Sequence, residues 1–252
     1  MSALLERLLR ESQERFPHSP SKQYLDSRHI SLEAQTEFQF GSFPSGKEIK
    51  HTSLPVEELL EAGLLYQREA SGHQGSFLYR SSFLEHHPLV LPYHDTYGKV
   101  IALVGRSLLT DSERQEQKIS KYKNTVFNKS EHLFNLHRAK KAIVEQNCAY
   151  LVEGQLDVIR AWEKGFFNFV AVGSSDLSFS QLLLLLRYTE NIFLLFDNDE
   201  AGIKGRRKIM QKWKDKANFQ CAFLPKYYKD ADEYFSDESY SGGLALRMEE
   251  LE

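Results

Sequence analysis

The stretches AYLVEGQLDVIRAW (residues 149–162) and NIFLLFDNDEAGIKG (residues 191–205) decide the fold class of this chain. Each begins with a short apolar run and stops abruptly at a carboxylate, which is Glu153 in the first stretch and Asp197 in the second. A buried strand that ends in an acid and leads into a helix places charge at the carboxyl edge of a sheet. Open α/β sheets bind their ligands at that edge. Two such strand ends in one unit predict a divalent-metal site.

Further acids follow the same strand ends. Asp157 lies four residues after the first acid, and Asp199 lies two residues after the second. If the strand geometry continues through this pair, both aspartate side chains leave on one side. A third acidic group, KDADEY (229–234), contains Asp230 and Asp232 with the same spacing. Taken singly, each group is explained by a helix N-terminus or a turn. Together they favour Mg²⁺, which takes oxygen ligands, and two such ions could activate a 3′-hydroxyl and stabilise a leaving pyrophosphate.

The segment 149–223 alternates apolar strands with helical segments, which is typical of parallel βαβ units in a sheet covered on both faces. The predicted fold class is α/β (α+β overall). An N-terminal mixed α+β basic subdomain is followed by a domain with a mostly parallel sheet and helices on both faces. We expect the boundary near 140–147, which gives an N-terminal subdomain over 1–145, a catalytic domain over 146–236 and an acidic tail over 237–252.

Composition excludes several classes of protein. The chain has 252 residues, 41% of them hydrophobic, and 32 Lys and Arg against 35 Asp and Glu, so the net charge of −3 does not by itself indicate a nucleic-acid partner. The only cysteines, Cys148 and Cys221, form no CxxC pair, which excludes a zinc ribbon and a disulfide framework. The longest apolar run, Leu182 to Leu186, is too short to cross a membrane, and the N-terminus lacks a signal-peptide core. We therefore expect no membrane partner and a cytoplasmic location.

The N-terminal half reads as mixed α and β structure. Leucine spacing predicts a helix over 3–15, and a second helix is expected over 21–28, followed by a third that Ser31 caps. The alternating pattern over 88–107, with a Tyr-Gly turn, predicts a β-hairpin. The polar stretch 110–117 shows no periodicity and is expected to be a mobile loop.

Two segments are strongly basic. Residues 118–141 hold seven Lys and Arg against one acid, with Tyr122 and Phe127 interleaved, and a helix whose apolar residues pack inward is expected to begin at Ser130. Cations with interleaved aromatic rings can hold the phosphates and bases of nucleic acid. Residues 203–216 have the same charge count, but we interpret them as a solvated helix face.

The acidic strand ends carry a family resemblance. EGQLDVI (153–159), followed about forty residues later by FDNDEAG (196–202), resembles the Toprim signature of a Glu-Gly at one strand end and Asp-x-Asp-x-Ala-Gly at another. Gly173 and Ser174 look like the Gly-Thr step that lies between the two in many Toprim proteins.

Upstream motifs narrow the resemblance to DnaG-type primases. VLPYHDTYGKVIALVGR (90–106) resembles the hairpin that precedes their Toprim domain, and KYKNTVFNKSEHLFNL (121–136) is similar to their lysine- and asparagine-bearing segment. KDADEY (229–234) resembles their paired-aspartate motif, although Ala231 stands where the family usually has proline. The resemblance covers roughly residues 20–236.

The resemblance implies a DNA primase core that joins ribonucleotides on a single-stranded DNA template. By this analogy Glu153, Asp197 and Asp199 carry metal-dependent catalysis. Metal or nucleotide binding is supported by Asp157, Asp230 and Asp232, and nucleic-acid or nucleotide binding by Arg28, Arg106, Lys121, Asn124 and Lys129. The expected cofactor is Mg²⁺ or Mn²⁺, without zinc. The expected partners are single-stranded DNA and ribonucleoside triphosphates, inside a bacterium or the bacterial host of a phage.

DnaG-type primases usually carry a zinc-binding domain before this region and a helicase-binding domain after it, and the sequence shows neither. It is either an excised core or a compact primase that takes these functions from a replicative helicase or a separate zinc-binding protein. The initial Met and the N-terminal helix favour the second option.

Two other functions stay open. A Toprim nuclease or RNA-processing enzyme would use the same acids to cleave a phosphodiester, with Glu153 as general acid or base. A non-enzymatic accessory subunit would bind nucleic acid and keep a vestigial site, against which the intact acids argue.

Overall fold

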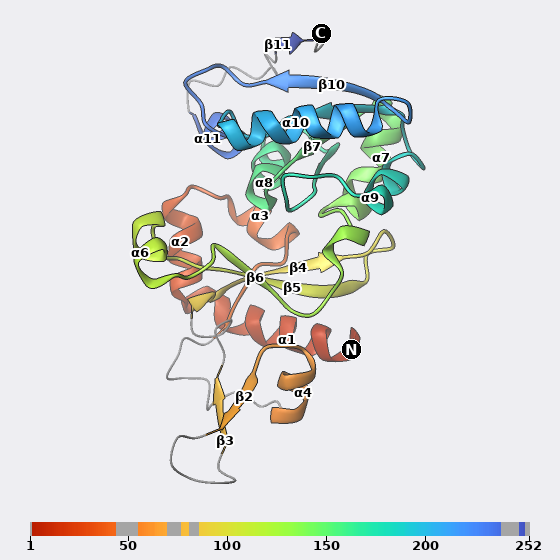
Figure 1. The fold of residues 1–252 in the computed structure, drawn as a ribbon. Helices are drawn as coiled ribbons and strands as arrows, with labels where there is room; N and C mark the ends of the chain where they lie inside the picture. Colours follow the sequence, from red (N-terminus) through yellow and green to blue (C-terminus); the bar gives the residue numbers. More distant parts are fainter. Residues whose placement is uncertain (1, 44–54, 70–76, 81–85, 238–246, 250–252) are drawn as a thin grey trace. The chain divides into compact units, whose positions relative to one another are not determined.

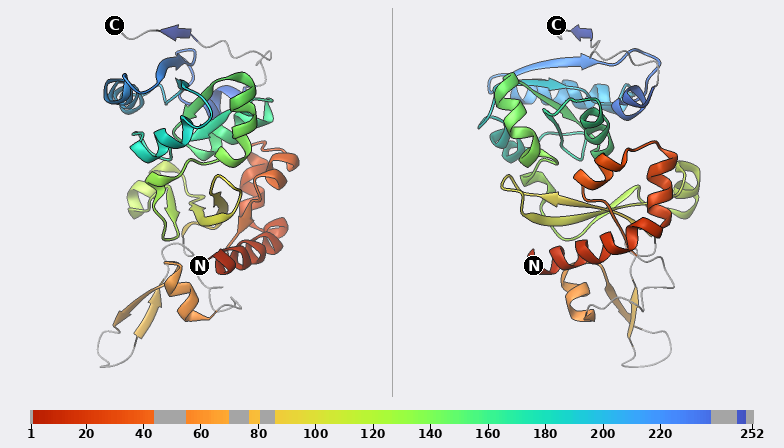
Figure 2. Two further views of the ribbon diagram at one scale, coloured as in Figure 1. Left: turned by 90° about the vertical axis from the view of Figure 1, so that its right-hand side faces the viewer. Right: turned by 180° about the vertical axis from the view of Figure 1, so that it is seen from behind.

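The computed structural model describes residues 2–43, 55–69, 77–80, 86–237 and 247–249 (Figures 1 and 2). The chain divides into two compact units. Unit 1 comprises residues 1–93 and 99–127, and unit 2 comprises residues 94–98 and 128–252. No helix among the described residues is long and apolar enough to cross a membrane.

Unit 1 combines short helices with a four-stranded sheet of order β1-β4-β5-β6, and β2 and β3 form a separate antiparallel pair. Its helices are α1 (Ser2–Arg15), η1 (Phe16–His18), α2 (Pro20–Ser27), α3 (Leu32–Glu37), α4 (Val56–Glu61) and α6 (Asp111–Gln117). Its strands are β1 (Gly41–Ser42), β2 (Tyr66–Glu69), β3 (Phe77–Arg80), β4 (Leu89–His94), β5 (Val100–Arg106) and β6 (Tyr122–Asn124).

The N-terminal helix supplies much of the core of unit 1. Leu4, Leu5, Leu8 and Leu9 of α1 are all buried, and they pack in one cluster with Leu103 of β5. This spacing is that of one helix face. The helix predicted over 3–15 is therefore confirmed, and so is the third helix, whose cap Ser31 accepts a hydrogen bond from the backbone N–H of Ala34.

The predicted hairpin over 88–107 is confirmed by β4 and β5, which are neighbours in the sheet. At the turn the backbone N–H of Gly98 donates to the carbonyl of Asp95 over 3.1 Å. Gly98 has φ +88°, a conformation that residues with a side chain rarely adopt. The returning strand β5 ends at Arg106.

The prediction of a mobile loop over 110–117 is wrong, because these residues form α6. Thr110 and Glu113 make a capping box: the Thr110 hydroxyl accepts from the Glu113 backbone, and the Glu113 carboxylate accepts from the Thr110 backbone. None of the α6 residues is buried. The helix therefore forms through its cap and lacks the apolar periodicity on which the loop prediction relied.

Unit 2 contains a five-stranded sheet of order β11-β10-β9-β7-β8. Strands β8, β7, β9 and β10 are parallel, and β11 pairs antiparallel with β10. The strands are β7 (Ala149–Val152), β8 (Phe169–Ala171), β9 (Asn191–Leu194), β10 (Asn218–Phe223) and β11 (Arg247–Glu249). The helices are η3 (Lys129–Glu131), α7 (Leu136–Gln146), α8 (Gln155–Glu163), α9 (Phe179–Leu185), α10 (Glu200–Trp213) and α11 (Ala231–Ser236).

Helices cover both faces of this sheet, as predicted. On one face Leu151 of β7 and Leu194 of β9 share a buried cluster with Ile143 of α7, Leu182 of α9 and Ile209 of α10. Figure 1 shows α10 running alongside β10.

The opposite face is aromatic. Tyr150 of β7 stacks between Phe169 of β8 and Phe193 of β9, with ring centroids 4.7 and 5.0 Å apart. Phe169 also meets Phe235 of α11 edge-on, and α11 packs against α8. Successive residues of a strand point to opposite faces. The alternation in β7 therefore divides the apolar side chains between the two helical layers.

The main segment of unit 2 begins at Asn128, earlier than the boundary expected near 140–147. The reason lies in Phe134, whose backbone exchanges two hydrogen bonds with Ala171 at the end of β8, of 2.9 and 3.2 Å. The predicted start of the helix at Ser130 is therefore wrong. A short 3₁₀ turn and this bridge come first, and the helix α7 begins at Leu136. The side chains predicted to pack inward, Leu133, Phe134 and Leu136, are all buried, although the first two precede the helix.

Most of the acidic tail expected over 237–252 lies outside the described residues. The structure describes only Asp237 and β11 of this range.

Candidate active site

Glu153 and Asp197 lie together at the carboxyl edge of the unit 2 sheet. Glu153 follows β7, and Asp197 comes shortly after β9, the parallel neighbour of β7. The backbone N–H of Asp197 donates a hydrogen bond to the Glu153 carboxylate. Asp199 is close enough for its charge to act on Glu153 as well. The chain thus brings together the three acids for which we predicted a catalytic role.

Burial raises the pKa of Glu153 to about 7, and the negative charges of Asp197 and Asp199 act in the same direction. One oxygen of this carboxylate, Oε1, is buried and accepts no hydrogen bond from the described residues. A buried oxygen without a partner costs free energy unless something binds it. A proton or a cation satisfies this oxygen, so the donor set fits a divalent metal ion.

The described side chains alone do not form a complete coordination shell for a metal ion. Within the described ranges no group of three or more His, Cys, Asp or Glu side chains is placed to hold a metal ion. This arrangement suits Mg²⁺ better than a cation that needs a complete protein shell. Mg²⁺ is usually held by one or two carboxylates, with water and substrate phosphates completing the octahedron.

The turn after β9 explains the Asp-x-Asp-x-Ala-Gly pattern. Asp199 caps α10, since its Oδ1 accepts the backbone N–H of Gly202 over 2.8 Å. A Cβ on Gly202 would lie 2.2 Å from the carbonyl oxygen of Asp197. Only glycine lets the first turn of α10 approach this carbonyl so closely, and the contact fixes the position of the Asp197 backbone in the turn after β9.

The sequence analysis did not identify Arg206, whose side chain hydrogen-bonds to the backbone of the same turn. Its side chain is only 2% exposed. Its Nη1 donates to the carbonyl of Phe196 over 2.5 Å and to that of Asp197 over 3.3 Å, and its guanidinium lies 4.7 Å from the Phe223 ring centroid. Arg206 follows Gly202 by four residues and precedes Ile209 by three, so helical spacing places it on the buried face.

Asp157 is buried, and both of its oxygens are engaged. Oδ2 accepts the backbone N–H of Gly154 over 3.0 Å, and Oδ1 accepts that of Asp232 over 3.1 Å. Burial raises its pKa well above the ordinary value, and the charges of Asp230 and Asp232 act in the same direction. Through these two contacts Asp157 links α8 to α11. Its expected contribution to metal binding stays a prediction.

The aspartate pair near α11 is also engaged in local contacts. Asp230 caps α11 by accepting the backbone N–H of Glu233 over 2.8 Å. Asp232 is buried and accepts a hydrogen bond of 2.9 Å from Nε of Arg160, which also pairs with Glu163 over 3.0 Å. These acids form a second network beside the first, linked to it by the charge of Asp197 on Asp157.

Three of the predicted basic residues gather around two tyrosines in unit 1. The guanidinium of Arg106 lies 5.3 Å from the ring centroids of both Tyr24 and Tyr122, and it donates to both hydroxyls. Arg28 donates to the Tyr24 hydroxyl over 3.3 Å, and Nζ of Lys121 lies 5.8 Å from the Tyr122 ring centroid. We call these five residues the arginine–tyrosine cluster.

The other two predicted basic-segment residues lie apart. Asn124 ends β6 and pairs with Val104 of β5. Lys129 belongs to unit 2, where its Nζ donates to the carbonyl of Gly173 over 2.5 Å. The backbone N–H of Gly173 in turn donates to the carbonyl of Glu153 over 3.0 Å. Lys129 is therefore tied to the strand end that carries the acids.

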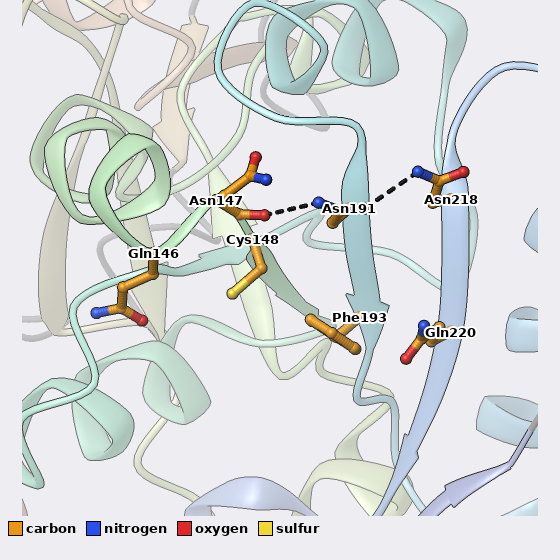
Figure 3. A pocket seen from close by; sticks show the side chains of 7 residues that line it. All are labelled: Gln146, Asn147, Cys148, Asn191, Phe193, Asn218 and Gln220. Atoms are coloured by element: carbon orange, nitrogen blue, oxygen red, sulfur yellow. Dashed lines mark hydrogen bonds between the residues drawn. The ribbon is translucent and has the colours of Figure 1, made fainter.

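A pocket of about 300 Å³ lies at the opposite edge of the unit 2 sheet (Figure 3). Asn191 and Asn218, the first residues of β9 and β10, line it, and the Asn218 side chain donates to that of Asn191 over 3.1 Å. Its lining contains amides, Cys148 and Phe193 but no carboxylate. This pocket is therefore separate from the acids.

Comparison with known proteins identifies the two parts of the chain. Residues 8–140 match the family "DNA primase catalytic core, N-terminal domain", and residues 150–235 match the Toprim-like family. A DNA primase of Enterococcus faecalis is 32% identical over 225 residues, which are 85% of this chain and 34% of that protein. The chain thus spans about a third of this curated relative.

Solved structures agree. The crystal structure of the Aquifex aeolicus primase, comprising zinc-binding and RNA polymerase domains, is 32% identical with a TM-score of 0.74, over 92% of this chain and 56% of that one. A DnaG primase catalytic domain bound to single-stranded DNA is 26% identical with a TM-score of 0.72, over 91% and 74%. Two family matches, the sheet topology and the placement of the acids agree, and the chain belongs to the family of DnaG-type primase catalytic cores with a Toprim-like domain.

Proposed function

We propose that this chain synthesises short RNA primers on single-stranded DNA by metal-dependent nucleotidyl transfer. The observation that carries the proposal is the buried, unpartnered oxygen of Glu153 beside Asp197 and Asp199, in a chain of the primase family. In the reaction the 3′-oxygen of one ribonucleotide forms a bond to the α-phosphorus of the next. The bond to pyrophosphate breaks, and the hydroxyl proton is released.

Glu153, Asp197 and Asp199 are the residues that would hold the metal ion. Toprim-type primases are in general metal-dependent, and we propose Mg²⁺ or Mn²⁺ here, without zinc. A bound ion would supply Lewis-acid activation of the 3′-hydroxyl and charge neutralisation at the phosphates. The protein contributes the fixed strand ends, the glycine turn at Gly202 and the guanidinium of Arg206 behind that turn. Asp157, Asp230 and Asp232 would support the same ion or the nucleotide.

The arginine–tyrosine cluster is the proposed contact for the template. A guanidinium fixed between two aromatic rings keeps its orientation, so that a phosphate or a base meets a preorganised donor. The relative solved with single-stranded DNA supports a DNA-binding role for the family. Lys129 and Asn124 would contact nucleotide or nucleic acid. In this division of labour, residues 1–145 bind template and residues 146–236 carry the chemistry.

The second candidate is a Toprim nuclease or RNA-processing enzyme. It is favoured by one observation: burial and neighbouring acids raise the pKa of Glu153 to about 7. A carboxyl group with such a pKa exchanges a proton near neutral pH and suits general acid–base catalysis of hydrolysis. Incubating the chain with labelled DNA and RNA without nucleotides distinguishes the two functions, because only a nuclease shortens the strands.

The primary test is RNA synthesis on a single-stranded DNA template with ribonucleoside triphosphates and Mg²⁺ or Mn²⁺. We expect short RNA products that require template and metal. The assay is run with the chain alone, then with a replicative helicase or a separate zinc-binding protein, the partners we propose. A lack of RNA products under all these conditions, together with strand cleavage, would replace the primase proposal by the nuclease.

A further inference from the structure

An aromatic pair, an exposed phenylalanine stacked on a half-buried tryptophan, joins α9 to α10 in unit 2. The rings of Phe179, the first residue of α9, and Trp213, the last of α10, stack with centroids 5.7 Å apart and planes 24° apart. The indole N–H of Trp213 donates to the carbonyl of Leu177 over 3.0 Å, which fixes that ring. Phe179 is 53% exposed, and Leu183, one turn further along α9, is 47% exposed. A rigid, flat apolar surface therefore faces solvent.

A column of lysines runs along α10 to this pair. Lys204, Lys208 and Lys212 are exposed and follow one another at intervals of four residues, about one helical turn each. Nζ of Lys212 lies 4.7 Å from the Trp213 ring centroid. Lys208 and Lys212 pair with Asp176 over 2.8 and 3.5 Å. Exposed pairs of this kind contribute only about 0–1 kcal/mol, so a phosphate can replace the carboxylate.

We propose that this surface binds single-stranded nucleic acid, with a base stacked on Phe179 and phosphates along the lysine column. The aromatic–lysine surface consists of Phe179, Leu183, Trp213, Lys204, Lys208 and Lys212. Single-strand binding sites combine these two elements, because every base has a face that stacks and every phosphate is negative. Six of the seven Lys and Arg in segment 203–216 are exposed, all but the buried Arg206, and they face one acid in the segment, which complements a polyanion and opposes a basic partner.

The position of the surface suggests a role for this binding in primer synthesis, and that role rests on the proposed function. Asp199 caps α10 at one end, and Trp213 closes the helix at the other. A helix of 14 residues is about 21 Å long at 1.5 Å per residue. A strand held along α10 therefore has one end near the acids. In the primase this surface would guide the template or the growing RNA as it leaves the site.

Tryptophan fluorescence tests the surface directly, because Trp213 is part of it. The chain contains two tryptophans, so Trp162→Phe leaves Trp213 as the reporter. The probes are oligomers of deoxythymidine and of uridine, each twelve nucleotides long by design, titrated at several salt concentrations without metal or triphosphates. We expect both oligomers to quench Trp213 emission in a saturable manner. Their relative affinity distinguishes a DNA path from an RNA path.

Substitutions in the surface separate stacking from charge. Phe179→Ala should weaken binding about tenfold, whereas Phe179→Tyr, which keeps a flat ring, should restore it. Alanine at all three column lysines should reduce the slope of log affinity against log salt by about 2, at roughly 0.7 per phosphate contact. Phe167→Ala is the matched control, because Phe167 is 46% exposed on the same unit but belongs to neither α9 nor α10. It should change nothing.

The outcomes distinguish this surface from the proposed activity. Asp197→Ala abolishes RNA synthesis in the primase proposal but should leave Trp213 quenching unchanged. Quenching without any RNA synthesis would retain the surface and reject the primase. The surface is rejected if neither oligomer quenches Trp213, or if quenching is the same in Phe179→Ala and the lysine variant. A surface that instead captures an acidic protein, with no response to either oligomer, would also overturn it.

Discussion

Replacing Glu153 with glutamine should make the metal-free protein more stable at high pH. The pKa of the folded carboxyl is raised from 4.5 to about 7, first by burial and then by Asp197. Between these values the folded state holds a proton that the unfolded state has released. Stability therefore falls as pH rises through this interval, by 1.36 kcal/mol per pH unit. A fully buried group would lose about 3.4 kcal/mol.

Glu153 is only partly buried, so screening by solvent reduces this loss to about 1.5 kcal/mol. Glu153→Gln removes the titration and keeps the size of the side chain. It should raise the melting temperature by about 3–6 °C at pH 8 and leave it unchanged at pH 4.5. The assay is thermal unfolding in EDTA at both pH values, and Glu190→Gln, at an exposed position before β9, is the matched control.

Adding Mg²⁺ at pH 8 should stabilise the wild type and give Glu153→Gln a smaller gain, because the cation neutralises the carboxylate that the variant lacks. Equal melting temperatures of wild type and variant at pH 8 in EDTA would refute the assigned burial and repulsion at Glu153. An equal Mg²⁺ effect on both would refute the metal site.

The other predictions concern the turn after β9 and the template contact. Gly202→Ala should lower stability by about 1–3 kcal/mol in urea unfolding and reduce RNA synthesis, since its Cβ would collide with the Asp197 carbonyl. Asp199→Asn should keep the cap of α10, whereas Asp199→Ala should lose about 1 kcal/mol of folding stability with the cap. Both variants should bind the metal more weakly in calorimetry. Lys121→Ala should lower the slope of log affinity for template against log salt by about one unit, because Lys121 contacts a phosphate in the proposed complex. An unchanged slope would show that Lys121 makes no phosphate contact.

Much of unit 2 could be predicted from sequence, because its elements depend on local apolar runs. The strand Ala149–Val152 is apolar on both faces and ends at Glu153, and the same logic identified β9 and its aspartates. Side-chain periodicity carries this information, and parallel strands bring their ends to one edge. The placement of Glu153 beside Asp197 thus followed from the pattern alone.

The remainder depends on contacts between segments distant in sequence. The bridge from Phe134 to Ala171 replaces the expected helix start, and no local signal at Ser130 shows that a strand end lies nearby. The helix α6 has no buried side, so apolar periodicity could not reveal it, although its capping box, Thr110 with Glu113, is readable. The burial of Arg206 was missed because a charged segment was interpreted by its charge count alone.

We propose that the acids at this sheet edge perform nucleotidyl transfer, and RNA synthesis by charge-neutral variants is the direct test of their role. Asp197→Asn combined with Asp199→Asn keeps side-chain size and the cap on α10, and Asp215→Asn, at an exposed position after the helix, is the control. On a single-stranded DNA template with Mn²⁺, the wild type and the control should make RNA, and the double variant, folded by its melting curve, should make none. RNA synthesis by the folded double variant would show that Asp197 and Asp199 do not carry the reaction.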